Sequence, residues 1–344
     1  MDIDRIITEY KINIGCTKPL CISGLQKSTR VFKVSEAALM DNLYIIDTPS
    51  GKEIACHPHI VGKELDKLAL SAAGEAARAI SSVIFANKKE DDTRVVVENV
   101  LRASQGYKLF PALKALLPGR SIPQLFIRPR YVSKSYRDHV TRELQVVYKD
   151  FSELPKDKNI VLIKPDTEAT GASGVLSITE ALNESKKRGS NITDVVLYGF
   201  IAIPALRLLK KTTDEHGIKL HAFAIGNISE LASNNYDMTL YGIDESYFSK
   251  RGEIKKLGSI VDKSTLENYL PEFIPGCDQP GDWSDRQSRI FTGLGYEAGD
   301  IKGHLTRSIN LIENLRKISK YEAWQDAIAR KEITKLRKVL SIYK

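Results

Sequence analysis

The stretch 160–173 carries the clearest chemical signal in this chain. The four apolar residues 160–163 predict a buried parallel strand. Asp166 and Glu168 follow, and the small residues 169–173 then open a helical pattern. The free N–H groups and the positive dipole end at such a helix start bind phosphate, and small side chains let the anion approach the backbone. The stretch therefore predicts a phosphate site at the carboxyl end of a strand.

The two acidic residues before this loop indicate a ligand with more than a phosphate group. Carboxylates repel phosphate, but they suit a divalent cation or the hydroxyl groups of a ribose. A ligand with a phosphate, hydroxyls and a metal-bound pyrophosphate meets all of these demands, and 5-phosphoribosyl 1-pyrophosphate (PRPP) is such a ligand. An ordinary strand-to-helix turn with an acidic cap is the alternative interpretation.

The same stretch resembles the PRPP-binding loop of the type I phosphoribosyltransferases, most closely that of the uracil phosphoribosyltransferases, which reads Asp-Pro-Met-Leu-Ala-Thr-Gly-Gly-Ser. Residues 169–171 and Ser173 match this loop, Ala172 replaces its second glycine, and Pro165-Asp166 reverses its Asp-Pro order. The resemblance implies that Asp166 is catalytic and, with Glu168, holds the ribose hydroxyls. It also implies a substrate-binding role for the rest of the loop: Thr167, Ala169, Thr170, Gly171, Ala172 and Ser173.

A second segment, 100–107, resembles the pyrophosphate-binding loop of the same family, Ile-Leu-Arg-Ala-Gly-Leu-Gly. It follows the apolar run 95–97 and places Arg102 and Ala103 at a turn of small residues. A guanidinium group can bind two phosphate oxygens at once. We therefore expect Arg102 to be a catalytic residue that meets the pyrophosphate together with Mg²⁺, and Ala103 to contact the substrate. The alternative is a strand end with a surface arginine.

A third resemblance lies in 273–276 and 281–286, which are similar to the family signature Pro-Gly-Leu-Gly-Asp-Ala-Gly-Asp-Arg. That signature binds the nucleobase through backbone groups. Here an insertion at 277–280 separates its halves, and Trp283-Ser284 replaces Ala-Gly. The resemblance, which spans about 61–291, implies that Asp282 is catalytic. We expect the remaining base contacts to come from this region and from the end of a neighbouring strand: Gly276, Gly281, Trp283, Asp285, Phe200 and Ile201.

Strand and helix patterns alternate between 94 and 243. They predict an α/β fold, a mostly parallel sheet with helices on both faces, like that of the type I phosphoribosyltransferases. The periodicity predicts helices at 63–85, 107–117 and 204–216 and a strand at 238–243. We expect three parts: a small β-rich accessory segment (1–58), the phosphoribosyltransferase-like domain (59–299) and a C-terminal helical extension (300–344).

The composition is that of a soluble globular protein, with 42% hydrophobic and 27% charged residues among 344. The N-terminus does not resemble a secretory signal, and no apolar run approaches the roughly 20 residues that span a bilayer. We therefore expect a cytoplasmic protein without a membrane partner. The net charge of +8 is spread along the chain. A positive protein attracts a polyanionic substrate, whereas nucleic-acid binding has no motif behind it.

Two further features have no assigned role at this stage. Cys16, Cys21, Cys56, His57 and His59 are ligand types for zinc, but their spacing departs from that of a compact zinc site. Buried cysteines and surface histidines are the alternative, and we assign no metal there. The basic segment 128–137 lies where the family carries a flexible loop over its active site. A basic surface loop is the alternative interpretation.

The sequence thus predicts an enzyme that transfers the phosphoribosyl group of PRPP to a nucleobase, with Mg²⁺ as cofactor. Uracil is the best single guess, giving UMP and pyrophosphate. A non-catalytic regulator that binds PRPP or a nucleotide on the same fold stays open, and so does a transferase for a different base. We expect the chain to form a homodimer or a higher homo-oligomer.

Overall fold

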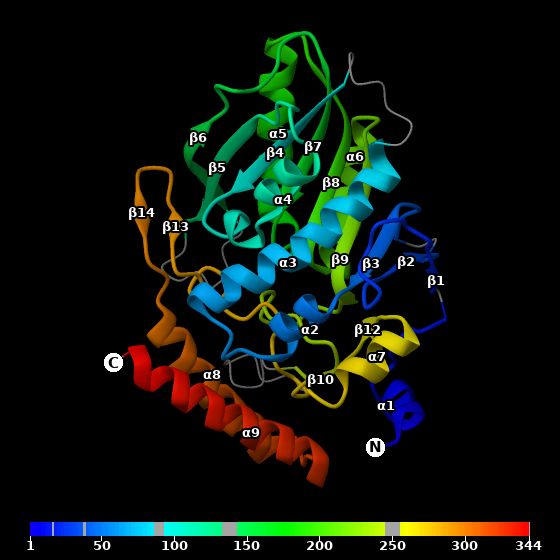
Figure 1. Cartoon of the computed structure of the whole chain (residues 1–344), viewed down its shortest axis with the longest axis vertical. Helices are drawn as coiled ribbons and strands as arrows, with labels where there is room; N and C mark the ends of the chain where they lie inside the picture. The colour runs from blue at the N-terminus through cyan, green and yellow to red at the C-terminus, as the bar shows by residue number, and fades with distance from the viewer. Residues whose placement is uncertain (16, 37–38, 86–92, 133–142, 245–254, 344) are drawn as a thin grey trace.

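The computed structural model describes residues 1–15, 17–36, 39–85, 93–132, 143–244 and 255–343. Its centre is a ten-stranded sheet (Figure 1). In spatial order the strands are β1 (Thr17–Pro19), β2 (Arg30–Val34), β3 (Leu43–Asp47), β9 (Lys219–Ser229), β8 (Asn191–Ala202), β7 (Asn159–Pro165), β4 (Thr93–Val100), β5 (Gln124–Tyr131) and β6 (Leu144–Asp150), and β12 (Ser259–Ile260) pairs with β9.

The six strands from β3 to β5 in this order are parallel to one another, and each antiparallel pair of the described residues includes at least one strand outside this group. This sheet, with helices on both faces, confirms the predicted fold class. Parallel strands place their carboxyl ends along one edge, where ligands of such sheets bind. The loops that follow β4 and β7 therefore lie near each other.

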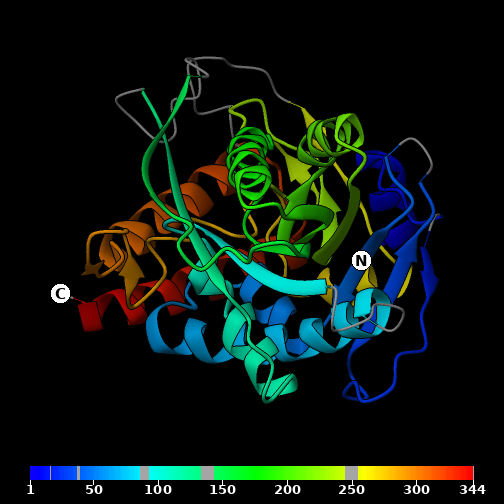
Figure 2. The same cartoon turned by 90° about the horizontal axis from the view of Figure 1, so that it is seen from above.

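Two helical layers cover the sheet. Helices α2 (Pro49–Cys56), α3 (Gly62–Ile80) and α4 (Leu109–Leu116) lie on one face, and α5 (Ala172–Lys187) and α6 (Ile203–Glu215) lie on the other (Figure 2). Alternate residues of β7 pack against the two layers, because successive side chains of a strand point to opposite faces. Val161 and Ile163 join the core beneath α3, and Ile160 and Leu162 join the core beneath α5 and α6.

The predicted long helix at 63–85 consists of α3 and a π-helical turn, Ser81–Phe85. The segment Gly62–Phe85 is long and apolar enough to cross a membrane, but half of its apolar stretch is buried inside the protein. Its alanines, among them Ala69, Ala73 and Ala76, are almost fully buried. Small side chains let the helix lie close to the sheet, as in the core helix of a globular domain.

The N-terminal segment contains α1 (Ile3–Tyr10), and its strands β1 to β3 extend the central sheet through the parallel pair of β3 and β9. The C-terminal extension consists of α8 (Ile301–Ile318) and α9 (Ala323–Leu340), followed by the short η4 (Ser341–Tyr343). Before them come α7 (Lys263–Tyr269) and two small hairpins, β10 (Gly242–Ile243) with β11 (Lys256–Leu257) and β13 (Ile290–Phe291) with β14 (Tyr296–Glu297).

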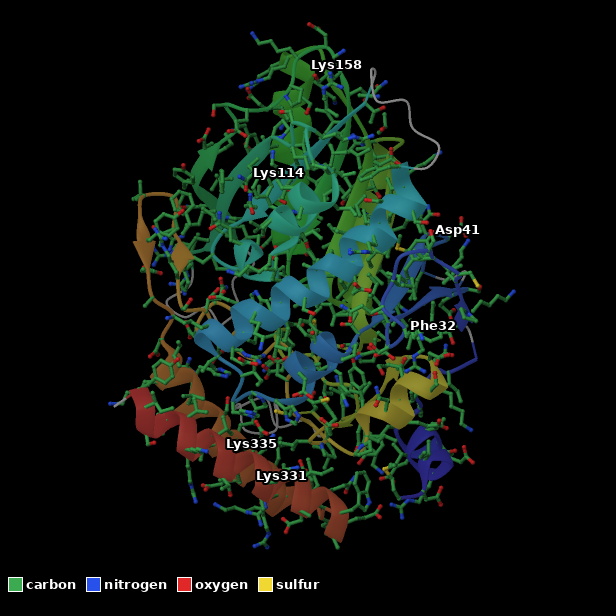
Figure 3. The ribbon with its side chains drawn as sticks, in the orientation of Figure 1. Phe32, Asp41, Lys114, Lys158, Lys331 and Lys335 are labelled. Atoms are coloured by element: carbon green, nitrogen blue, oxygen red, sulfur yellow. The ribbon has the colours of Figure 1, made fainter. Side chains whose placement is uncertain are left out.

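Two predicted elements differ from the structure. Of the strand expected at 238–243 only Gly242 and Ile243 form a strand, β10. The Met238 N–H donates to the Asp278 carboxylate, and the carbonyls of Met238 and Tyr241 accept from the backbone N–H groups of Gln279 and Gly276, so these residues bond to a loop and not to a neighbouring strand. The helix expected at 107–117 begins only at Leu109, after a 3-10 turn, η2 (Ser104–Tyr107). Lysines are spread over the molecule, as the sequence indicated: Lys114 and Lys158 lie far from Lys331 and Lys335, which are neighbours on α9 (Figure 3).

Candidate functional site

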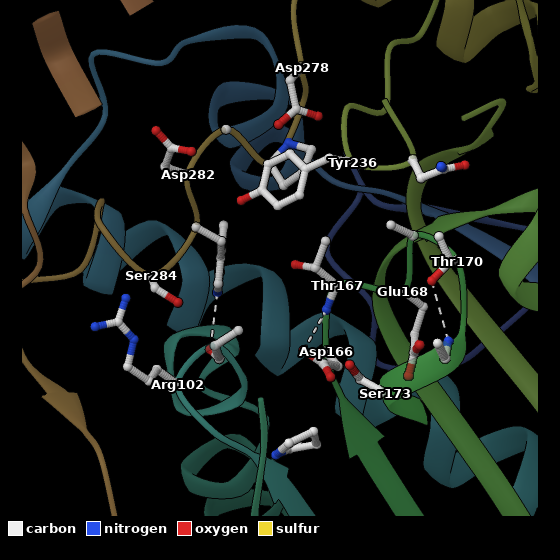
Figure 4. Close-up of a pocket in the computed structure, with 18 of the residues that line it drawn as sticks. Arg102, Asp166, Thr167, Glu168, Thr170, Ser173, Tyr236, Asp278, Asp282 and Ser284 are labelled. Carbon is white, nitrogen blue, oxygen red and sulfur yellow. Dashed lines mark hydrogen bonds between the residues drawn. The ribbon is translucent and has the colours of Figure 1, made fainter. Parts of the chain in front are cut away.

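A cavity of about 290 Å³ lies at the carboxyl ends of the parallel strands (Figure 4). Its walls come from the loop after β4, the end of β5, the loop between β7 and α5, the loop after β9 and the segment before β13. The lining residues are Arg102, Ala103, Pro129, Tyr131, Asp166, Thr167, Glu168, Ala169, Thr170, Gly171, Ala172, Ser173, Asn235, Tyr236, Asp278, Pro280, Gly281, Asp282, Trp283, Ser284 and Asp285.

The loop between β7 and α5 brings a helix N-terminus to the cavity wall. Gly171 precedes the first residue of α5 with φ +81° and has no side chain to cap the helix, and the Ala172 N–H at the helix start donates a long hydrogen bond of 3.4 Å to Thr170 Oγ1. A Cβ at this position would lie 3.0 Å from the Cα of Ala205 in α6, so both the backbone angle and the close packing require glycine. Ala172 and Ser173 line the cavity. The positive end of α5 is therefore presented to whatever fills it.

Two buried carboxyl groups lie beside this helix start. Asp166 accepts a hydrogen bond from the Thr167 backbone N–H at 2.8 Å, and Glu168 Oε1 is buried without a hydrogen-bond partner among the described residues. Burial, then the charge of Glu168, raises the pKa of Asp166 well above its usual value. Burial likewise raises the pKa of Glu168 to about 7. Polar or cationic ligand groups would satisfy both side chains.

A buried ion pair lies below the two carboxyl groups. Lys164 Nζ donates to Glu98 Oε2 at 2.8 Å and to Ser177 Oγ at 2.5 Å, and both charged side chains are fully buried. Burial lowers the pKa of Lys164, but Glu98, Glu168 and Asp166 outweigh it and raise that pKa. Lys164 thus partly neutralises a cluster of three acids. The sequence interpretation missed it, although a charged residue directly after four buried positions was a visible signal.

Arg102 lies at the edge of the cavity, next to Ser284 in Figure 4. It follows a cis peptide bond between Leu101 and Arg102. Its guanidinium donates to Glu297 Oε1 at 2.5 Å and lies 3.9 Å from Asp285 Oδ1, and the side chain is about one-third exposed. The guanidinium is therefore close enough to meet an anion in the cavity. Its acidic neighbours are Asp285, in the segment before β13, and Glu297 of β14.

An arginine and an aromatic pair fix the position of the cavity wall formed by 281–285. Arg307 of α8 bonds Asp282 and Asp285, each at 2.7 Å. Trp283 Nε1 donates to the Ala103 carbonyl at 3.2 Å, and the indole stacks on Tyr107. These contacts join the wall to α8 and to the loop after β4. The wall therefore has a fixed position relative to Arg102.

The fully buried Arg286 fixes the same segment from behind. Its guanidinium donates to the backbone carbonyls of Ile54, His57, Ile60 and Pro280, at 2.9 to 3.2 Å. Burial lowers its pKa to about 10. His304 of α8 adds a bond to the Pro58 carbonyl at 2.9 Å. The loop between α2 and α3 therefore supports the wall of the cavity.

The structure brings most of the predicted site residues to this cavity, but not Phe200, Ile201 or Gly276. Strand β8 continues to Ala202, and the Phe200 carbonyl accepts from the Glu168 N–H at 2.9 Å, so Phe200 and Ile201 support the loop from within the sheet. The Phe200 ring packs against Tyr107 and Trp283. Gly276 donates to the Tyr241 carbonyl at 2.8 Å and does not line the cavity.

Seven lining residues were not predicted individually as site residues, although Asp278 and Pro280 belong to the region expected to bind the base: Pro129, Tyr131, Asn235, Tyr236, Asp278, Pro280 and Ser284. Asn235 and Tyr236 follow β9, so the rule that ligands bind at carboxyl ends of strands would have found them. Tyr236 faces the β7–α5 loop across the cavity in Figure 4. Of the basic segment 128–137, Pro129 and Tyr131 line the cavity, and 133–137 lies outside the described residues.

No protein-family model and no curated protein sequence matches the chain. Among solved structures, it is similar to adenine phosphoribosyltransferase of Trypanosoma brucei in complex with AMP, pyrophosphate and ribose-5-phosphate, with 13% identity, 56% of this chain and 87% of the other covered, and a TM-score of 0.33. For a hypoxanthine phosphoribosyltransferase of Staphylococcus aureus the values are 16%, 61%, 92% and 0.30. For orotate phosphoribosyltransferase of Francisella tularensis they are 20%, 47%, 63% and 0.26. These values are too low to assign the chain to a family.

Proposed function

We propose that this chain is a phosphoribosyltransferase, which transfers the phosphoribosyl group of PRPP to a nucleobase. The observation that carries the proposal is the convergence of three separate segments on one cavity: Arg102 after β4, the small-residue loop at the start of α5, and the wall at 281–285. Each has the chemistry to bind one group of the two substrates, namely the pyrophosphate of PRPP, its 5-phosphate with the ribose, and the base.

The reaction breaks the bond between the anomeric carbon and the pyrophosphate oxygen and forms a bond from that carbon to a base nitrogen. The bonding pair leaves with the pyrophosphate, and positive charge develops on the ribose. In this proposal Arg102 stabilises the leaving pyrophosphate, Asp166 and Glu168 hold the ribose hydroxyls, and backbone N–H groups at 170–173 bind the 5-phosphate. Fixed charges and orientation supply the catalysis.

Mg²⁺ belongs to the proposal as a cofactor. Carboxylate oxygens are its preferred protein ligands, and it usually keeps several waters and substrate phosphate oxygens. Asp285 offers such a donor, since it lines the cavity and its Oδ1 lies 3.9 Å from Arg102. The ion would be held there through water and pyrophosphate oxygens. When bound, it would neutralise the pyrophosphate as that group leaves.

Uracil is the proposed base. The support is the likeness of 273–276 and 281–286 to a uracil-binding signature, of which Gly281, Asp282, Trp283 and Asp285 line the cavity. Insertion residues Asp278 and Pro280 also line it, so this wall is built differently from the shorter signature. A transferase for another base is the alternative that this difference favours.

A regulator that binds PRPP or a nucleotide without turnover is the second candidate. One observation favours it: the charged groups proposed for catalysis are already engaged within the protein. Glu297 bonds Arg102, and Arg307 bonds both Asp282 and Asp285. A transferase must release or share these contacts in every catalytic cycle, whereas a regulator must do so only when its ligand binds.

The deciding experiment measures pyrophosphate release from PRPP with uracil, adenine, hypoxanthine and orotate, in Mg²⁺ and in EDTA. We expect Mg²⁺-dependent release with uracil and formation of UMP by chromatography. Release with another base alone would refute uracil and keep the transferase. Calorimetric binding of PRPP without release for any base would favour the regulator. If millimolar PRPP gave no heat of binding and no pyrophosphate release, both functions would be refuted.

A further inference from the structure

A second cluster of ligand-type side chains lies away from the cavity, between the loop 57–61 and α9. His57 Nδ1 lies 3.1 Å from Glu332 Oε2, and His59 Nδ1 lies 2.5 Å from Glu332 Oε1. These groups offer ligand atoms that all lie within 4.8 Å of one another. Glu332 and His57 are 2% and 7% exposed. Two imidazoles and a buried carboxylate thus converge on one point.

The hydrogen bonds of this cluster need a positive charge that the neutral side chains do not supply. His57 Nε2 lies 3.0 Å from Glu272 Oε2, so both of its ring nitrogens face carboxylate oxygens. Ionised carboxylates only accept hydrogen bonds, and a neutral imidazole has a single N–H. His59 Nδ1 faces the same Glu332 carboxylate. His57 therefore carries an extra proton, or a metal cation takes the place of one of its protons.

The surroundings have the arrangement typical of a metal-binding histidine. Such a histidine donates its other ring N–H to a carboxylate, which fixes the ring and its tautomer. Glu272 has this position opposite Nε2 of His57, and Lys52 Nζ bonds the other oxygen of Glu272 at 2.8 Å. The backbone N–H of His59 donates to Glu332 Oε1 at 3.1 Å and orients that carboxylate. His57 and Glu332 are therefore positioned before any ion arrives.

We propose that His57 Nδ1, His59 Nδ1 and Glu332 bind one divalent transition-metal ion of the zinc type. Zinc bonds imidazole nitrogen and carboxylate oxygen at 2.0–2.2 Å in tetrahedral geometry, so two of its ligands lie roughly 3.3 Å apart. The separation of 3.1 Å between His57 Nδ1 and Glu332 Oε2 fits this value, whereas the 2.5 Å between His59 Nδ1 and Glu332 Oε1 is shorter and must lengthen when the ion binds. Nitrogen donors favour zinc over Mg²⁺. A related trio, Glu53, His57 and Glu272, offers only one imidazole and a more exposed carboxylate, so it is the poorer site.

The site fastens the C-terminal helices to the wall of the cavity. Glu332 belongs to α9, whereas the carbonyls of His57 and Pro58 accept bonds from Arg286 and His304, which support that wall. An ion here links α9 to the backbone that positions 281–286. Its role is structural. Lys335 Nζ, 4.0 Å from Glu332, is one-third exposed and can turn to solvent when the ion binds.

The test uses the full chain, stripped with EDTA and titrated with Zn²⁺ alone in a calorimeter. We expect one equivalent to bind and to raise the melting temperature, and Co²⁺ to give the visible absorption of a tetrahedral site. His59→Ala should abolish all three responses. Glu272→Gln should weaken zinc binding by about 10- to 100-fold. These readouts do not involve PRPP, so their failure leaves the proposed function untouched.

Two control variants distinguish this site from other sources of zinc binding. Cys21 is an exposed thiol, and Cys21→Ser should bind zinc like the wild type. His216 is exposed at the end of α6, and His216→Ala should behave likewise. Folding of His59→Ala is checked by circular dichroism, and its partly exposed side chain makes it the safer variant than Glu332→Gln. Zinc binding that survives His59→Ala, or no zinc binding by the folded wild type, would overturn the proposal and assign the charge to a proton.

Discussion

Trp283 stacks on Tyr107, with ring centroids 4.3 Å apart and ring planes inclined by 22°. Trp283 is only 3% exposed, and its Nε1 donates to the Ala103 carbonyl at 3.2 Å. One face of the indole is therefore covered, and its N–H is used. The pair joins the wall at 281–285 to the loop after β4. The structure thus gives Trp283 a role in building the cavity, beside the substrate contact that the sequence predicted.

Trp283→Ala should lower the free energy of unfolding by about 3–5 kcal/mol, the usual cost of removing a buried aromatic side chain. Urea unfolding followed by circular dichroism measures it. Trp283→Phe keeps an aromatic ring on Tyr107 and should lose less. Trp324→Ala on the half-exposed side of α9 is the control, with a smaller loss. A cost below about 1 kcal/mol for Trp283→Ala would show that the stack is not structural.

The buried pair of Lys164 and Glu98 predicts a second stability effect. Lys164→Met leaves Glu98 as an uncompensated buried charge, and breaking such a pair costs about 3–5 kcal/mol. Adding Glu98→Leu removes that charge as well, so the double variant should recover much of the loss. Denaturant unfolding of the four proteins in this cycle gives the coupling energy. Additive effects of the two changes would contradict a direct interaction.

The sheet and the main loops could be predicted because their signals are local. The run 160–163 supplies both layers of core, with Ile160 and Leu162 on one face and Val161 and Ile163 on the other. Since both the 101–103 turn and the 166–173 loop follow parallel strands, they had to reach one sheet edge. Phe200 and Ile201 do not reach the cavity because β8 continues through both of them to Ala202.

Contacts between distant segments gave no local signal. His57 and Glu332 are separated by 275 positions, and no spacing rule joins the loop after α2 to a glutamate near the C-terminus. The sequence groups His57 and His59 with cysteines, whereas in the structure both imidazoles face Glu332 of α9; Cys21 is exposed, and Cys16 lies outside the described residues. Packing of α9 against the 57–61 loop determines this cluster.

Arg102→Ala should weaken PRPP binding by about tenfold or more, because a charged hydrogen bond to phosphate contributes about 1.5–3 kcal/mol. Binding of ribose 5-phosphate, which lacks the pyrophosphate, should change little. Calorimetry with both ligands in Mg²⁺ measures the contrast. Arg207→Ala is the matched control, since Arg207 is exposed on α6 and does not line the cavity. Equal losses for the two ligands would mean that Arg102 does not bind the pyrophosphate.

Glu297→Gln tests whether the contact at 2.5 Å restrains Arg102. The variant removes the negative charge and frees the guanidinium for the ligand, so PRPP should bind at least as tightly as in the wild type. Calorimetry under the conditions used for Arg102→Ala gives the comparison. Weaker PRPP binding in Glu297→Gln would indicate that the ion pair positions Arg102 and does not compete with the ligand.

Glu168 should make the free energy of unfolding depend on pH in a specific way. Its pKa is raised by burial from 4.5 to about 7. Between these two values the folded protein binds more protons than the unfolded chain, so this group's contribution to stability is lost as pH rises through the window. Glu168→Gln cannot ionise. The free energy of unfolding of the variant, minus that of the wild type, should therefore increase by roughly 2 kcal/mol between pH 5 and pH 7.5.

Urea unfolding at the two pH values measures this difference, and the subtraction removes the carboxyl groups whose pKa does not depend on Glu168. Several of those have a lowered pKa, such as Glu184 beside Arg188, and act in the opposite direction. The pKa of Asp166 is also raised, in part by the charge of Glu168. The free energy of unfolding of the variant therefore still depends on pH, but less steeply than that of the wild type. Glu215→Gln, an exposed change on α6, should leave the wild-type curve unaltered. A Glu168→Gln curve parallel to the wild type would show that Glu168 is ionised in the folded protein throughout this range, with Lys164 as the compensating charge.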